Sequence, residues 1–215
     1  GPHVSPHHQR VGFVMTDVPF VAFEKIPRLK RDVVVTEKID GTNVCIYISD
    51  DLGTVLAGSR TRWIYPNRKQ EPVGPWYPPP KAPPDTDNYG FAAWVEANRE
   101  DLLKLGPGTH YGEWWGRGIN RGYGLKDRRF SLFNVSRWAD PATVPTCVGV
   151  VPVLATGPLD ESVDKALRKL REDGSFASPG FLDPEGVVVY QASSRRLFKV
   201  TLKNDDEPKG RVVRP

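Results

Sequence analysis

The sequence predicts an α+β fold in which paired, mostly antiparallel strands carry two packed helices. Short segments rich in β-branched residues alternate with turn residues along most of the chain. Only two stretches show the 3.6-residue apolar period of a helix. The length of 215 residues and the hydrophobic content of 39% are those of a globular domain with a substantial core.

The N-terminal half is expected to contain three strands that follow one another closely. Segments at 33–38, 44–49 and 54–59 have strand composition, and an Asp-Asp-Leu-Gly turn joins the last two. Residues 61–85 hold eight prolines, so neither a helix nor a central strand can run through them. We expect a long loop there, which is typical of a functional or mobile segment.

The C-terminal half mixes the two predicted helices with further strands. A helical period runs over 88–105 and stops at a Gly-Pro pair, and an amphipathic helix is expected over 159–172. The segments of strand composition in this half are 109–115, 129–135, 148–155 and a final hairpin of 185–191 with 196–203.

The charge, hydropathy and cysteine content of the sequence indicate the kind of partner and the cellular compartment to expect. The net charge of +4 is compatible with a polyanionic partner. No apolar stretch is long enough to span a bilayer and no signal peptide is seen, so we expect a cytoplasmic, reducing location without a membrane partner. Cys45 and Cys147 are interpreted as reduced core residues. We place one domain at 11–204, between a tag remnant with a flexible N-terminus at 1–10 and a polar tail at 205–215.

The stretch TEKIDGTN, which starts at Thr36, puts an amine at the end of a valine-rich strand. Lys38 follows that strand, and Asp40 and Gly41 form a turn directly after it. The side chain of Lys38 has two interpretations: a strand-end lysine that reaches water, or a nucleophile held near a substrate. The residues further along the chain decide between them.

Two acidic residues next to glycines and one alternating strand accompany Lys38. Glu113 follows a glycine in a predicted strand, and Glu185 precedes a glycine and three valines. In the last strand, a period of two places Lys199, Thr201 and Lys203 on one face. Two ammonium groups on one face are expected to line a cleft.

Taken in order, these motifs resemble the covalent nucleotidyltransferase superfamily of ATP-dependent polynucleotide ligases and mRNA capping enzymes, and most closely the bacteriophage RNA ligase (RNA-editing-ligase) type. The resemblance implies a nucleotidyltransferase (ATP-grasp-like) domain of antiparallel sheets flanked by helices. The last motif departs from the family pattern, because Thr201 stands where a lysine is usual. The motifs that carry the resemblance are EKIDGTN, GSR, YGEWWG, FSLFNV, EGVVVY and FKVTLKN.

The resemblance assigns the phosphate chemistry to a small group of residues. Lys38 is the nucleophile that forms lysyl-AMP, and Lys199 and Lys203 supply positive charge, with the choice between them open at the α-phosphate. Glu185 faces the lysine and organises Mg²⁺, for which Mn²⁺ can substitute, and Asp40 assists, through water where it does not bind directly.

The remaining assignments concern the nucleoside part of ATP. Arg60 contacts the ribose or the terminal phosphate, and Glu113 holds the ribose hydroxyls. Phe133 stacks on adenine with Phe130 as its competitor, and Glu37 helps to read the base. Gly41 completes the ATP-binding set.

The function implied is ATP-dependent RNA ligation at 5′-phosphate and 3′-hydroxyl ends, by a monomer. The alternatives are a minimal DNA nick ligase and, from another class, a non-catalytic module that binds nucleic-acid ends; a capping enzyme fits less well. The chain ends shortly after the last motif, so we expect a domain without an OB-fold partner. Strand binding is then expected from the loops at 61–85 and 116–129, although the first can equally be a rigid lid.

Overall fold

The computed structural model describes residues 18–23, 32–67, 87–191, 195–202 and 208–209. The chain divides into two compact units, residues 1–30 and 31–215. In the first unit, the described residues form no helix or strand. The second unit contains all the elements described below. Lys203 and most of the proline-rich segment lie outside the described residues, as do the expected tag remnant and most of the expected tail.

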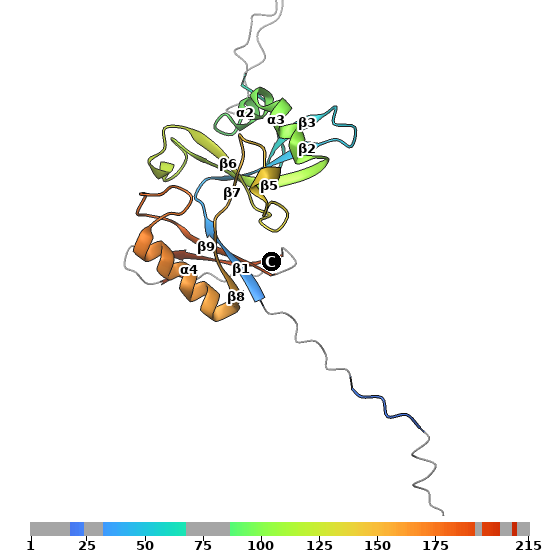
Figure 1. The fold of residues 1–215 in the computed structure, drawn as a ribbon. Helices are drawn as coiled ribbons and strands as arrows, with labels where there is room; N and C mark the ends of the chain where they lie inside the picture. The colour runs from blue at the N-terminus through green and yellow to red at the C-terminus, as the bar shows by residue number, and fades with distance from the viewer. Residues whose placement is uncertain (1–17, 24–31, 68–86, 192–194, 203–207, 210–215) are drawn as a thin grey trace, which may run out of the picture. The chain divides into compact units, whose positions relative to one another are not determined.

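One of the two sheets of the second unit is fully antiparallel and follows the order β11-β10-β9-β1-β8. The N-terminal strand β1 lies between two C-terminal strands, so the predicted hairpin of β9 and β10 joins the sheet beside the lysine motif (Figure 1). We call this sheet A. Its strands are β1 (Asp32–Lys38), β8 (Val153–Pro158), β9 (Gly186–Gln191), β10 (Arg196–Leu202) and β11 (Pro208–Lys209).

The second sheet, sheet B, follows the order β4-β3-β2-β5-β6-β7, and only its β6–β7 pair is parallel. Both sheets pack helices on the side away from the other sheet, with α4 against sheet A and α2 against sheet B (Figure 1). The predicted α+β class is therefore confirmed. The strands of sheet B are β2 (Thr42–Ile48), β3 (Val55–Ser59), β4 (Trp63–Ile64), β5 (Gly108–Gly116), β6 (Arg128–Leu132) and β7 (Gly149–Val150).

The helices depart from the prediction in the first of the two segments, where the helix begins at Phe91 rather than at residue 88. The amphipathic helix expected over 159–172 is α4, but the segment expected as one helix over 88–105 is broken at Asn98. Asn98 leaves helical geometry with φ −108° and ψ 15°, and its side-chain amide donates to the Trp94 carbonyl at 2.8 Å. The helical elements are α2 (Phe91–Ala97), α3 (Arg99–Leu102), α4 (Leu159–Asp173) and the 3₁₀ turns η1 (Leu103–Leu105), η2 (Gly122–Gly124) and η3 (Pro141–Thr143).

Three predicted strand boundaries were also wrong. The strand expected over 148–155 is two strands, because Pro152 has no amide hydrogen to continue a ladder. The strand expected over 129–135 ends at Leu132, after which the Phe133 amide turns to the Tyr111 carbonyl at 3.1 Å. The segment expected as a loop from residue 61 begins with the short strand β4.

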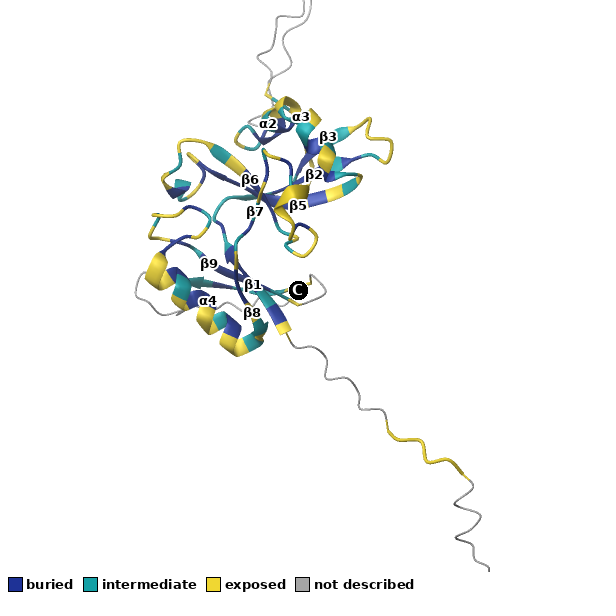
Figure 2. Ribbon diagram, in the orientation of Figure 1, coloured by how far each residue is buried: buried dark blue, intermediate teal, exposed yellow. Residues whose placement is uncertain are grey.

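Each sheet has its own hydrophobic cluster (Figure 2). Val35 and Val189 lie in the cluster under α4, and Ile46 and Phe130 lie in the cluster under α2. Strands with alternating burial leave the opposite faces of both sheets free to form a cleft. Within the described residues, no helix is long and apolar enough to cross a membrane, and Cys45 and Cys147 are unpaired.

Candidate active site

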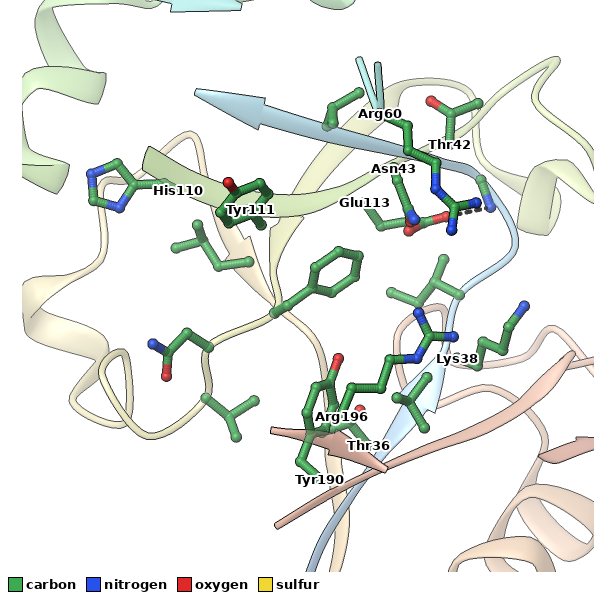
Figure 3. Close-up of a pocket in the computed structure, with 18 of the residues that line it drawn as sticks. Thr36, Lys38, Thr42, Asn43, Arg60, His110, Tyr111, Glu113, Tyr190 and Arg196 are labelled. Atoms are coloured by element: carbon green, nitrogen blue, oxygen red, sulfur yellow. Dashed lines mark hydrogen bonds between the residues drawn. The ribbon is translucent and has the colours of Figure 1, made fainter. Parts of the chain in front are cut away.

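A cleft of about 1060 Å³ is lined by the mutually facing sides of the two sheets. From sheet A it receives Thr36, Lys38 and Tyr190, because these residues alternate with the buried valines of β1 and β9. From sheet B it receives Asn43 and Glu113 by the same rule. Figure 3 shows these side chains directed into one shared space.

Lys38 ends β1 opposite Gly186, the first residue of β9. Its Nζ atom donates to Oε1 of Glu185 in a close ion pair, and both side chains are largely shielded from water, with exposed fractions of 18% and 17%. The amine is therefore fixed inside the cleft, which contradicts the interpretation of Lys38 as a lysine that reaches out to solvent.

The turn after Lys38 is held by a separate segment that leads into η2. The Asp40 amide donates to Oη of Tyr123 at 2.7 Å. The Asp40 carboxylate accepts from Nδ2 of Asn120 at 2.9 Å and from Arg121 at 3.0 Å, and Asn120 also donates to the Gly41 carbonyl at 3.0 Å. We call Asn120, Arg121 and Tyr123 the turn clamp, since they bond to both ends of the turn.

Gly41 is required by the close approach of this turn to β5. A Cβ atom at residue 41 would lie 2.3 Å from the Trp114 carbonyl oxygen, which is backbone and cannot move aside. The Gly41 amide instead donates to Oε1 of Glu113 at 3.0 Å. The motif turn and the acid of the YGEWWG motif are thus brought together by a direct hydrogen bond.

Glu113 is nearly fully buried in the cleft. Burial is the largest influence on its carboxyl group and raises the pKa to about 8, against the lowering influence of the Gly41 amide and Lys38. A carboxyl group of this kind gains from hydroxyl donors, which would replace the water it has lost. The assignment of Glu113 to the ribose hydroxyls is consistent with this need.

Glu185 has one oxygen engaged and one oxygen available. Among the described residues, Oε2 is the one buried side-chain nitrogen or oxygen atom that lacks a hydrogen-bond partner, and Nη1 of Arg121 lies 4.0 Å from it. The described residues contain no cluster of three or more acidic, histidine or cysteine ligands. A single free carboxylate oxygen fits Mg²⁺ or Mn²⁺, because Mg²⁺ binds through one or two carboxylates together with substrate phosphates and water. The Asp40 carboxylate is already occupied by the turn clamp.

The other residues expected at the site fall into two groups. Arg60, Phe133 and Lys199 all line the cleft, whereas Phe130 is fully buried among Phe91 and Trp94 in the core of sheet B and cannot stack on a ligand. The first group therefore contributes two cationic side chains and one aromatic ring to the lining of the cleft.

The carboxylate of Glu37 points to the opposite side of β1. It accepts from the hydroxyl of Ser175 at 2.9 Å and from the amides of Phe176 and Ala177 at 2.7 and 3.2 Å. Burial raises the pKa of Glu37 while these donors lower it. Both carboxylate oxygens of Glu37 are thus engaged away from the cleft, although Glu37 is among the residues that line it.

Sequence reasoning did not single out several cleft residues. Tyr190 and Arg196 are cross-strand neighbours in β9 and β10, and Figure 3 shows the two side chains next to each other in the cleft. Side chains of a strand alternate between its two faces, and this rule placed Lys199 on the cleft side of its strand. The same rule would have placed Tyr190 in the cleft, because Tyr190 lies two residues after Val188, which also lines it. No local signal identifies Arg121, because its contacts with Asp40 join segments 81 residues apart.

Comparison with solved structures gives the same fold for the chain. The Naegleria gruberi RNA ligase matches in a variant form with ATP and Mn, at 18% identity and a TM-score of 0.52, over 88% of this chain and 57% of that one. The same ligase with PPi matches at 20% identity and a TM-score of 0.52, over 84% and 53%. An apo form of another variant matches at 21% and 0.51, over 82% and 50%. The chain therefore spans about half the length of these structures.

Sequence comparison adds the family. No curated protein matches the sequence. The family model described as RNA ligase matches residues 31–201, from just before β1 to the penultimate residue of β10. That match covers well over half of the sequence and includes the lysine motif, the turn clamp and Glu185, so the chain belongs to the RNA ligase family.

Proposed function

We propose that the protein is an ATP-dependent RNA ligase that works through a lysyl-AMP intermediate. The observation that carries the proposal is the pairing of Lys38 with Glu185 in a cleft whose other wall presents Glu113. A shielded amine, a carboxylate that orients it and a buried acid suited to hydroxyl groups are the parts that nucleotide transfer to a lysine requires.

In the proposed first step, Nζ of Lys38 attacks the α-phosphorus of ATP. A phosphorus–nitrogen bond forms as the bond to the pyrophosphate oxygen breaks, and pyrophosphate leaves. The amine must lose its proton, and Oε1 of Glu185 is the acceptor in contact with it. Lys199 and Arg60, which line the same cleft, offset the charge on the phosphates.

The nucleoside would occupy the part of the cleft between the sheets. Phe133, which directly follows β6, and Val188 from sheet A provide apolar surfaces for the base, and Glu113 accepts from the ribose hydroxyls. The variant ligase from Naegleria gruberi with ATP and Mn has the same fold, which supports a nucleotide in this cleft.

A divalent metal, Mg²⁺ or Mn²⁺, would be held by Oε2 of Glu185 together with phosphate oxygens. When bound, it neutralises the charge that develops on the leaving pyrophosphate. Asp40 orients the turn through the clamp and belongs to the outer layer of the site.

After the first step, the adenylyl group is passed to a 5′-phosphate end. A 3′-hydroxyl then attacks that adenylylated end, which seals the strand and releases AMP. We propose RNA as the preferred substrate because of the family, and a monomer in the cytoplasm as the working form. A DNA nick ligase would use the same first step. The two hypotheses therefore differ only in whether RNA or DNA supplies the 3′-hydroxyl.

Matched nicked duplexes with an RNA or a DNA 3′-end test the proposal directly. The proposal predicts sealing of the RNA-ended nick in the presence of ATP and Mg²⁺, at a higher rate than the DNA-ended nick. Faster sealing of the DNA-ended nick would favour the DNA ligase reading. A protein that seals neither nick and accumulates no adenylylated 5′-end would contradict ligase activity altogether.

A further inference from the structure

Sheet B carries exposed aromatic side chains on its cleft-facing side, beyond the residues assigned to the nucleotide. Tyr111 and Trp63 are 62% and 45% exposed, although both belong to strands of the sheet. Tyr47, which is half-buried, contacts Trp63 with a ring-centroid separation of 6.0 Å. We call Tyr47, Trp63 and Tyr111 the aromatic face.

The strand register places the aromatic face next to the nucleotide part of the cleft. Tyr111 pairs with Cys45, Cys45 with Gly58, and Gly58 with Trp63, so these four residues form one row across β5, β2, β3 and β4. Because side chains alternate along a strand, this row lies on the same side of the sheet as Glu113, one step further out. The aromatic face is therefore a continuation of the cleft.

The missing side chain of Gly58 shapes this surface. A Cβ atom at residue 58 would lie 3.3 Å from two carbons of the Trp63 ring and 2.6 Å from Sγ of Cys45. The indole ring thus rests on the bare backbone of β3, while nearly half of Trp63 remains open to solvent. A fixed indole of this kind is preorganised for stacking, because little side-chain freedom remains to be lost on binding.

Positive charge borders the aromatic face where it meets the cleft. Arg60 and Arg62 are exposed residues of the β3–β4 hairpin, and both line the cleft. Aromatic rings that stack on bases, beside cations that follow a phosphate backbone, are the combination found in surfaces for single-stranded nucleic acid. An apolar protein partner would not pair with the two arginines at the edge of the aromatic face.

We propose that the aromatic face binds unpaired nucleotides of the strand whose end reacts in the cleft, with Trp63 as a stacking platform. The inference rests on the proposed function, which supplies the nucleic acid. It adds the place where that strand lies and a preference for an unpaired segment next to the end, since both faces of a base inside a duplex are already covered by its neighbours.

The test measures binding of a fluorescently labelled, 5′-phosphorylated single-stranded RNA to the full chain. Loss of one stacking partner in Trp63→Ala should weaken binding by about 10-fold. Trp63→Phe keeps an aromatic ring and should bind nearly as tightly as wild type. Phe176→Ala, which removes a similarly exposed aromatic residue outside the row, serves as the matched control and should leave the affinity unchanged.

A second measurement does not depend on the stability of the alanine variant. RNA should quench part of the tryptophan fluorescence of the wild type, and Trp63→Phe should lack that part of the quenching. Equal RNA affinity in wild type and Trp63→Ala, or equal quenching in wild type and Trp63→Phe, would overturn the inference.

The outcome is separable from that of the proposed function. Formation of lysyl-AMP from ATP alone needs no RNA, so it should be equal in wild type, Trp63→Phe and Phe176→Ala. Absence of lysyl-AMP in the wild type would refute the proposed function. Normal lysyl-AMP formation together with unchanged RNA binding in Trp63→Ala would refute the aromatic face alone.

Discussion

The free energy of unfolding of the wild type should fall as pH rises, because Glu113 is buried in the cleft. Replacing Glu113 by glutamine should remove this pH dependence. Burial raises the pKa of Glu113 from the ordinary value of 4.5 to about 8. Between these values the unfolded side chain is ionised and the folded one is protonated. Folding then takes up a proton, so the free energy of unfolding falls as pH rises through this interval and levels off above it.

The size of the effect follows from the interval. At about 1.4 kcal/mol for each pH unit, the full loss is about 5 kcal/mol, which is an upper limit. Half of that loss would lower Tm by about 5–10 °C, at about 2–4 °C per kcal/mol for a chain of this size. Glu113→Gln is neutral at every pH and keeps an oxygen that can accept from the Gly41 amide.

The assay is thermal unfolding of both proteins without nucleotide, from pH 5 to pH 9. The two melting temperatures should lie close together at pH 5, and the variant should become progressively more stable than the wild type up to pH 8. A difference in Tm that stays constant across this range would refute the reasoning, because Glu113 would then have the same charge in the folded and unfolded states.

Two further predictions concern the groups around Lys38. Arg121→Gln should slow lysyl-AMP formation by about 10-fold or more, because the turn clamp on Asp40 loses its charged member. Arg117→Gln is the control. Arg117 is an exposed residue of the same loop, and its variant should keep the wild-type rate. Glu185→Gln should slow the same step by at least 100-fold and raise the Mg²⁺ concentration needed for half-maximal rate, and an unchanged Mg²⁺ titration would argue against Oε2 as a ligand.

Much of the fold was predictable because the strands carry their burial pattern in the sequence. The alternation around Lys199 and the valines after Glu185 placed the correct residues in the cleft and in the core. The boundaries that failed depend on single local events. Asn98 breaks a helical period that continues past it, and the ladder interruption at Pro152 divides one apolar segment into two strands.

The candidate site was predictable where short motifs carry it and unpredictable where distant segments meet. Lys38, Glu113 and Glu185 each stand beside a glycine or a turn that marks them. The clamp on Asp40 by Arg121 joins segments that share no pattern, and the aromatic face exists only because the register aligns Trp63 with Tyr111 across four strands. Contacts of this kind depend on the order of the strands in the sheets, which local sequence patterns do not predict.

The central claim is that the amine of Lys38 is the nucleophile, and the intact mass of the protein after incubation with ATP and Mg²⁺ tests it most directly. The wild type and Lys104→Ala, which alters a lysine paired with Asp101 at the surface, should gain the mass of one adenylyl group. Lys38→Ala should gain none while retaining its folded state. An adenylyl adduct on Lys38→Ala, or its absence from the wild type, would contradict the account.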